Sequence, residues 1–350
     1  MPFSPFRGEL DDDKIRFLVQ LLSSAMQLSS PNFQVEAEHR ICITQALKLA
    51  AETKARAKGV KYEDGKLINV ETTDTPVITL DDVIAALGTL TGVSEFEKYG
   101  PIIDELSKKL RPYYSDGIYA PFFRSTVAGS KAKEVDLYVY DLDALAGDTI
   151  LQTLVTMSIV DEIRRKIVSQ GGKERGGYVV IEELGMLGRN NPVAKDFVID
   201  AAETFRKLGF FLIGLTPNPR NYFEIPAGQA MWAVADHYLL MAMKEDNVDF
   251  LAKNSTLLDE ATVQIAKSLK TIRGKSADCL YVHKSKAFSG AFTSKPSGRE
   301  LWLMPTHLPD ALEAQKTLKR FEGDPLAAWE DLVERYPTGT KDIASEEQAR

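Results

Sequence analysis

The sequence predicts an α/β protein: an amino-terminal helical subdomain is followed by a mainly parallel sheet with flanking helices. Three observations support this. Apolar side chains recur at helical spacing through most of the first 110 residues. Beyond them, short apolar runs alternate with long amphipathic segments, which is typical of strand–helix–strand units. The chain has 350 residues, of which 44% are hydrophobic and 27% charged, and this allows a sizeable core.

The helical subdomain is expected over 1–125. Asp11, Asp12 and Asp13 place acids where they favour the dipole of a first helix. Apolar residues from Ile15 to Met26 then share one helical face. Thr79 and Asp82 resemble a capping box at the start of another helix. The predicted helices cover about 11–26, 34–57, 83–90 and 94–110, with a turn at 61–66 and a loop at 72–76.

The α/β core is expected over 126–305. Its predicted strands cover 135–141, 178–181, 210–215 and 234–243, with crossover helices at 149–169 and 192–208. Ligands of parallel sheets bind at the carboxyl ends of the strands. Those ends carry Asp141, the pair Glu182 and Glu183, and Thr216.

The remaining segment, 306–350, is expected to form carboxyl-terminal helices and a polar tail. Two further strands are predicted near the end of the core, at 278–283 and 300–304. Two helices are predicted after it, at 310–320 and 325–336.

Composition excludes several classes of function. The formal net charge of −7 argues against a protein that coats nucleic acid, because such proteins need a basic face. Two distant cysteines, Cys42 and Cys279, suggest neutral thiols in a reducing compartment. The four histidines have no second ligand type at metal spacing, which argues against a zinc site.

No run approaches the roughly 20 apolar residues that span a bilayer. The start of the chain lacks a basic region followed by an apolar run, so no signal peptide is expected. We therefore expect a cytoplasmic protein.

The most specific local signal is the hexapeptide Tyr178–Glu183. An apolar strand that ends in two acids has the form of a Walker B element, in which the first acid holds magnesium and the second orients the attacking water. Magnesium prefers hard oxygen ligands, so carboxylates suit this role. Strand ends with two acids are also common as solvated termini. Asp141 is a competing candidate, with a helix-capping role as the alternative.

No glycine-rich segment meets the requirements of a phosphate-binding loop. Residues 171–177 are rich in glycine but precede a strand, whereas a phosphate loop follows a strand and opens a helix. Gly274, Lys275 and Ser276 match the end of G-x-x-x-x-G-K-[ST], but Leu269 stands where the first glycine is required. The sequence therefore contains no Walker A motif.

Five blocks stand in order along the chain: Ser4–Arg7, Leu106–Phe123 with its Pro-Tyr and Tyr-Ala pairs, Leu137–Leu142, Tyr178–Glu183, and Phe205–Gly209 leading to Thr216. Together they resemble the conjugative-transfer ATPases of type IV secretion systems, the TraC-like branch of the FtsK/HerA superfamily. The resemblance covers nearly the whole chain.

This resemblance implies a RecA-like core with a helical subdomain, and ATP with Mg²⁺ as cofactors. It also implies a hexamer at the cytoplasmic face of the inner membrane, held there by other secretion components. By the same resemblance Glu183 is the catalytic acid and Glu182 holds magnesium through water. Thr216 is then part of the nucleotide sensor. Arg206 could reach a neighbouring subunit's nucleotide, or could serve with Lys207 as a helix-terminal cation.

Three departures from the family pattern leave alternatives open. The Walker A loop is absent, Glu182 replaces the usual aspartate, and Pro217 replaces the sensor glutamine. Proline cannot donate a hydrogen bond to a phosphate. The chain is thus expected either to pair with a separate amino-terminal half that carries Walker A, or to be unstable alone. An inactive interaction module and a DNA translocase remain the alternative functions. For the cofactors, the alternative is that this chain binds none by itself.

Overall fold

The computed structural model describes most of the chain. The described residues are 5–6, 10–57, 61–63, 66–68, 77–124, 137–142, 145, 147–170, 176–182, 198–199, 201, 205–272, 274–286, 288–303, 305 and 307–340. The chain divides into two compact units, 1–179 with 190–212, and 180–189 with 213–350. Among the residues placed in the structure, no helix is long and apolar enough to cross a membrane.

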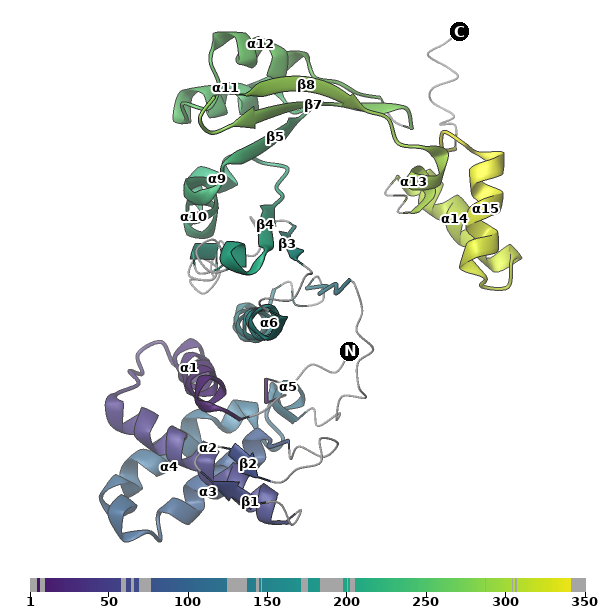
Figure 1. The fold of residues 1–350 in the computed structure, drawn as a ribbon. Coiled ribbons are helices and arrows are strands. Elements are labelled where there is room, and N and C mark those ends of the chain that lie inside the picture. The colour runs from purple at the N-terminus through teal and green to yellow at the C-terminus, as the bar shows by residue number, and fades with distance from the viewer. Residues whose placement is uncertain are drawn as a thin grey trace. The chain divides into compact units, whose positions relative to one another are not determined.

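The first unit is mainly helical, as predicted (Figure 1). Asp11 caps its first helix by accepting a hydrogen bond from the backbone N–H of Lys14. Thr79 and Asp82 form the expected capping box. Its elements are α1 (Asp12–Ser29), α2 (Ala37–Ala57), β1 (Lys61–Glu63), β2 (Lys66–Ile68), α3 (Leu80–Leu90), η1 (Ser94–Tyr99), α4 (Gly100–Lys109), η2 (Arg111–Tyr113), α5 (Ala120–Arg124), α6 (Thr149–Gln170) and η4 (Phe205–Leu208).

The core of this unit is formed by the apolar faces of α1 to α4 and one end of α6. Leu18 and Leu22 of α1 are fully buried, as are Ile43 and Leu47 of α2 and Leu87 of α3. These residues recur three or four positions apart, so each helix presents one apolar stripe to the others.

A polar contact also joins α1 to α6. The Lys14 ammonium lies 2.7 Å from the Asp161 carboxylate, and both side chains are almost fully buried. Arg165 donates to Asp161 and also reaches Asp11, the cap of α1. Because an unpaired buried charge is costly, this network fixes how the two helices pack.

One predicted strand is not observed. Residues 137–141 of the expected strand 135–141 have no regular structure, and 135–136 lie outside the described residues. The side chains of Leu137 and Val139 are 76% and 78% exposed. A strand forms only by pairing, and no strand in the described part of the chain pairs with this segment.

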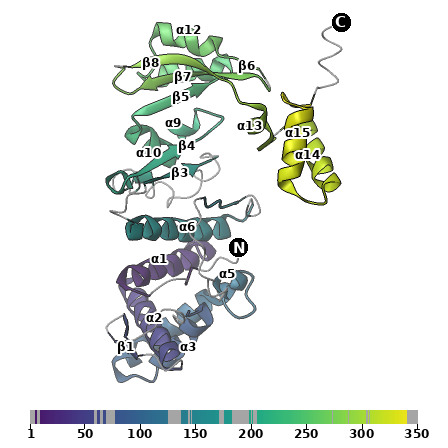
Figure 2. The ribbon, with the colours of Figure 1, turned by 45° about the vertical axis from the view of Figure 1, so that its right-hand side comes forward.

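The Walker B-like strand is observed as β3 (Gly177–Ile181), beside β4 (Phe210–Gly214) (Figure 2). Gly177 N donates to Gly209 O, and Leu215 N donates to Ile181 O. Both bonds join residues in the same order along the two strands, so the pair is parallel, as predicted. Gly176 must lack a side chain, because a Cβ there would lie 2.2 Å from Gly209 O.

One face of this strand pair is open and apolar. Side chains alternate between more and less exposed along both strands. Tyr178 is 71% exposed and Phe211 55%, and their rings lie 5.9 Å apart. Val180 and Ile213 continue the exposed alternation. Parallel sheets are normally covered on both faces. In the described part of the chain, this face of the β3–β4 pair is exposed instead.

The second unit contains an antiparallel sheet. The predicted strand 234–243 is observed as β5 within it and pairs antiparallel with β7. The pairing covers all five residues of β5, from His237 opposite His283 to Met241 opposite Cys279. The elements are α9 (Asn221–Glu224), α10 (Pro226–Val234), β5 (His237–Met241), α11 (Glu245–Asn254), α12 (Glu260–Ser268), β6 (Thr271–Ile272), β7 (Ser276–His283), β8 (Ser289–Ser294), α13 (Gly298–Leu303), α14 (Leu308–Arg320) and α15 (Pro325–Arg335).

Helices α11 and α12 cover one face of this sheet (Figure 1). Tyr238 and Leu240 of β5 and Leu280 and Val282 of β7 point into that core. Since side chains alternate along a strand, the residues between them lie on the other face.

The predicted strand 300–304 is instead helix α13, with Met304 outside the described residues. The reason is a capping box that the apolar pattern did not reveal. Ser297 N donates to the Glu300 carboxylate, and Glu300 N donates to Ser297 Oγ. This reciprocal pair starts a helix.

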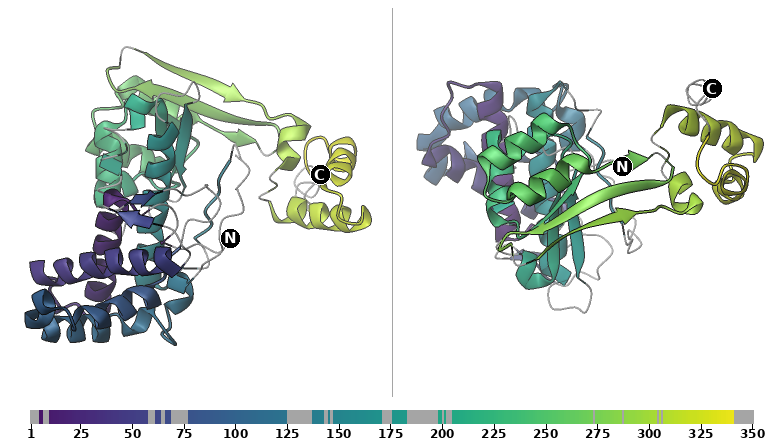
Figure 3. Two further views of the ribbon diagram at one scale, coloured as in Figure 1. Left: turned by 60° about the horizontal axis from the view of Figure 1, so that its bottom comes forward. Right: turned by 90° about the horizontal axis from the view of Figure 1, so that it is seen from above.

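The two predicted carboxyl-terminal helices are confirmed as α14 and α15, which gather with α13 (Figure 3). The segment that follows α15 is tied back to them. Trp302 Nε1 donates to Tyr336 O, at 2.7 Å, and Thr340 N donates to the buried carboxylate of Asp310, also at 2.7 Å.

Candidate functional site

The candidate site lies where β3 and β4 end. The hydrogen bond from Leu215 N to Ile181 O, 2.8 Å long, makes these two residues neighbours across the strands. Glu182 directly follows Ile181 and Thr216 directly follows Leu215, so both stand at the same carboxyl edge. This is the edge at which open α/β sheets bind ligands. The Glu182 side chain is exposed there, and Thr216 is half-buried.

The Thr216 hydroxyl is held within its own loop. It donates to Asn218 O at 3.1 Å and accepts from Asn221 Nδ2 at 2.9 Å and from Asn218 N at 3.3 Å. A hydroxyl has one proton to donate and two lone pairs. All three are engaged, so Thr216 contacts a phosphate only if the loop rearranges.

The loop that carries Thr216 is further fixed by two neighbours. Asn218 Oδ1 accepts from Arg220 N, which closes a turn. Tyr222 Oη donates to Gly214 O at 2.8 Å, and burial raises the pKa of that phenol. Sequence reasoning missed Asn218, Asn221 and Tyr222. The Asn-Pro pair at 218–219 was the available signal, since it favours a turn.

The other predicted site residues are not brought to this edge by the described structure. Glu183 lies outside the described residues. Arg206 is exposed in η4 and precedes β4, whereas Thr216 follows that strand. Asp141 is exposed in a segment without regular structure. Glu182 and Thr216 are therefore the two candidates that the strand pairing places together.

The described residues do not by themselves fit a magnesium–nucleotide complex. Glu182 is the one described carboxylate at the strand ends, and the Thr216 hydroxyl is engaged. Over the described ranges no three side chains of His, Cys, Asp or Glu gather to hold a metal ion. Magnesium requires near-octahedral oxygen coordination, which one carboxylate cannot supply alone. Further oxygen ligands would have to come from outside these described side chains, such as from water or the nucleotide.

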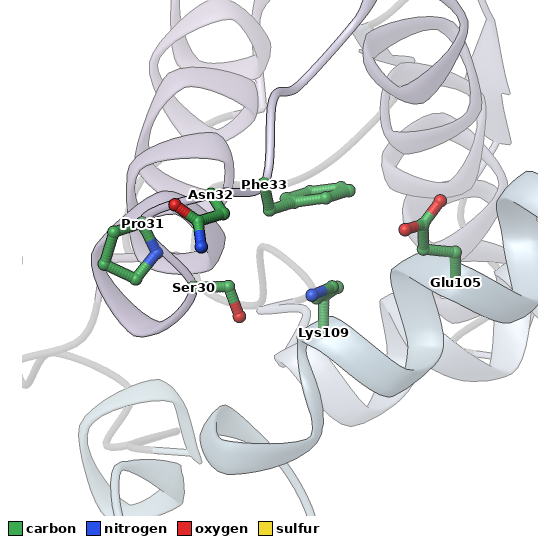
Figure 4. Close-up of a pocket in the computed structure, with 6 residues that line it drawn as sticks. All are labelled: Ser30, Pro31, Asn32, Phe33, Glu105 and Lys109. Atoms are coloured by element: carbon green, nitrogen blue, oxygen red, sulfur yellow. The ribbon is translucent and has the colours of Figure 1, made fainter.

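A cavity of about 390 Å³ lies within the helical unit, between the loop after α1 and helix α4 (Figure 4). Glu105 and Lys109 are one turn apart on α4 but do not pair. The Lys109 ammonium lies 4.9 Å from the Phe33 ring centre, and the Glu105 carboxylate lies 3.5 Å from buried His39 Nε2. None of the predicted site residues lines this cavity.

No family model and no curated protein matches the chain. Solved structures do match. VirB4 of Thermoanaerobacter pseudethanolicus aligns over 85% of this chain and 74% of its own, with 17% identity and a TM-score of 0.54.

The bacterial conjugative coupling protein TrwB matches more weakly. Its unbound form aligns over 84% of this chain and 64% of its own, at 13% identity and a TM-score of 0.35. Its complex with the GTP analogue GDPNP aligns over 80% and 68%, at 12% identity and a TM-score of 0.37. The predicted fold class is confirmed by the likeness to VirB4, with which this chain shares a mixed α/β architecture.

Proposed function

We propose that this chain is a component of a conjugative type IV secretion apparatus, in the place of the TraC-like ATPase that energises pilus assembly and substrate transfer. The observation that supports this most is the shared fold with VirB4 over 85% of the chain. The ordered sequence blocks that resemble the same family are independent of that comparison. Fold alone does not fix activity, which depends on the residues of the site.

In this proposal the chain has the three parts predicted from the sequence. Residues 1–125 form the helical subdomain, 126–305 the RecA-like core and 306–350 the carboxyl-terminal helices and tail. The protein assembles as a hexamer and lies at the cytoplasmic face of the inner membrane through other secretion components. ATP and Mg²⁺ are the cofactors.

Glu183 would orient the attacking water and Glu182 would hold magnesium through water, since they follow the Walker B-like strand β3. Thr216 would sense the nucleotide after its loop releases it. Arg206, exposed at the amino end of β4, would serve a nucleotide on a neighbouring subunit.

We also propose that a separate chain carrying a Walker A loop completes the site. The support is the open apolar face of β3 and β4, with Tyr178 and Phe211 more than half exposed. A sheet of two strands is marginal in water. Another chain that packed on this face would cover these side chains and could bring the Walker A loop that the sequence lacks.

The test is binding of a fluorescent ATP analogue with Mg²⁺. The intact chain is measured alone and together with the product of the neighbouring upstream gene, if that product contains G-x-x-x-x-G-K-[ST]. Binding is expected only for the mixture, and hydrolysis by the mixture should fall at least a hundredfold with Glu183→Gln. Glu330→Gln, on α15 and exposed, is the matched control. Absence of binding in the mixture would contradict the ATPase proposal.

A second candidate is an interaction module that does not hydrolyse ATP. The engaged Thr216 hydroxyl and the adjacent Pro217 favour it, because neither offers a donor to a phosphate. Normal assembly of the apparatus with Glu183→Gln in place would support this candidate over the first. A DNA translocase is the third, and the net charge of −7 disfavours it. DNA binding that weakens steeply with salt would favour it.

A further inference from the structure

Two histidines that are 46 positions apart in sequence face each other across β5 and β7. The register pairs His237 with His283, and their ring centres are 5.2 Å apart. Neither residue belongs to the candidate nucleotide site. Both lie within the second unit, on the sheet face opposite to the one that α11 and α12 cover.

The hydrogen bonds around the pair show that it occupies a non-hydrogen-bonded position of the ladder. Lys284 N donates to Asp236 O, and these two residues lie directly after β7 and directly before β5. His283 N donates to Phe288 O, on the other side of β7. At such positions the two Cα atoms are only about 4.5 Å apart and the side chains approach most closely.

The separation of the rings suits shared coordination. Imidazole nitrogens bind zinc at about 2.0–2.1 Å in tetrahedral geometry. Two rings that bind one such ion through Nε2 have centres roughly 5 Å apart. The observed 5.2 Å between the ring centres matches this separation.

Each ring has a partner for its other nitrogen. His237 Nδ1 lies 2.7 Å from Tyr281 Oη, and His283 Nδ1 lies 2.7 Å from Ser285 Oγ. Metal-binding histidines usually donate their second N–H to such an oxygen, which fixes the ring and leaves the other nitrogen for the metal. For His283 this requires that Nδ1 carries the proton and donates to Ser285 Oγ. The hydrogen bond from Ser285 N to Nδ1 is then lost, because a protonated Nδ1 cannot accept.

We propose that His237 and His283 form a site for a divalent transition metal ion, with both Nε2 atoms as ligands. His237 is exposed and His283 half-buried, so the site is open to solvent. Water or a donor from a partner molecule fills the remaining positions. Imidazole suits Zn²⁺, Cu²⁺ and Ni²⁺, of which Cu²⁺ binds most strongly to a given set of ligands.

Lys284 does not oppose the ion. Its side chain alternates to the other face, and its ammonium donates to Ala233 O at 2.7 Å. The alternative is that the two rings form only a cross-strand aromatic pair. That alternative predicts no saturable metal binding.

The experiment titrates the full chain with ZnCl₂ by calorimetry and with Cu²⁺ by electron paramagnetic resonance. We expect one ion per chain, nitrogen couplings from two imidazoles, and a rise in melting temperature on adding zinc. His237→Asn and His283→Asn should each weaken binding at least tenfold. Ser285→Ala should weaken it about tenfold through loss of ring orientation.

His307→Asn is the matched control, because His307 lies 3.8 Å from Asp310 and is the competing histidine–carboxylate pair in this unit. It should bind zinc as the unaltered chain does. Melting curves without metal establish that each variant folds. Binding that fails to saturate at one ion per chain would overturn the proposal. So would equal binding by the folded His237→Asn variant, or equal loss in His307→Asn.

Discussion

The ammonium of Lys14 and the carboxylate of Asp161 meet 2.7 Å apart, although 147 positions separate them in the sequence. Burial lowers the pKa of Lys14, and the charge of Asp161 offsets part of that effect. Helices α1 and α6 are therefore joined by a buried ion pair as well as by apolar packing.

Asp161→Asn is expected to destabilise the folded chain by about 3–5 kcal/mol, because it leaves the Lys14 charge buried without its partner. Urea unfolding followed by far-ultraviolet circular dichroism measures the change. Asp13→Asn removes the exposed pair with Arg16 and one acid from the first turn of α1, so it should cost at most about 1 kcal/mol. Equal effects of the two substitutions would show that burial does not govern the Lys14–Asp161 pair.

Tyr113 makes stability depend on alkaline pH. Its hydroxyl donates to Ala25 O at 2.7 Å and contacts Ser29 Oγ, and burial raises its pKa to about 12. The folded state thus keeps the phenol neutral after the unfolded state, with its ordinary pKa of 10.0, has lost the proton. This contribution is fully present below pH 10 and is lost between about pH 10 and 12.

Tyr113→Phe should cost about 1 kcal/mol near neutral pH through the lost hydrogen bond. It should also flatten the decline in stability above pH 10. The measurement is the free energy of unfolding as a function of pH, with Tyr114→Phe as control. If the two variants show the same alkaline decline, Tyr113 is not its source.

Gly228 is required where α9 meets α10. A Cβ at this position would lie 1.9 Å from Asn221 O, a backbone atom that cannot move aside cheaply. Gly228→Ala is expected to destabilise the second unit by at least about 2 kcal/mol, as overpacking does. Gly88→Ala is the contrast, since a Cβ there meets nothing within 4 Å and the residue lies inside α3.

Gly88→Ala should therefore stabilise the chain by about 0.5–1 kcal/mol, because alanine favours a helix interior. Melting temperatures of the two variants measure both effects. The steric argument fails if both alanines change stability in the same direction.

The open face of β3 and β4 predicts self-association. Val180→Thr and Phe211→Thr replace exposed apolar side chains with ones that strands accept, so they should reduce light scattering of the purified chain. Their melting temperatures should change little. Ile181→Thr, at a position only 7% exposed, should instead lower the melting temperature. Unchanged scattering in the first two variants would mean that this face does not drive association.

Much of the fold could be predicted because the relevant signals are local. The periodicity of α1 and α2, the Thr79–Asp82 capping box and the apolar run of β3 each lie within a few residues. The prediction for the segment 137–141 was wrong for the opposite reason. Its composition suits a strand, but a strand exists only with a neighbour, and composition does not show whether one is present.

The candidate site was only partly predictable. The sequence placed Glu182 and Thr216 at strand ends, and parallel pairing brings those ends to one edge. It could not show that the Thr216 hydroxyl is engaged by Asn221, since that depends on the path of the loop. The His237–His283 pair was missed because local spacing does not reveal cross-strand register.

The short segment after α15 sets a limit on how the protein can be shortened or labelled. Thr340 reaches Asp310, Tyr336 reaches Trp302, and Thr338 passes so close to Gly274 that a Cβ there would lie 2.1 Å from its carbonyl oxygen. A fluorescent fusion joined after Thr340 leaves all three contacts in place. A chain that ends at Arg335 loses all three contacts. The segment 336–340 would then no longer connect the turn before β7 with helices α13 and α14.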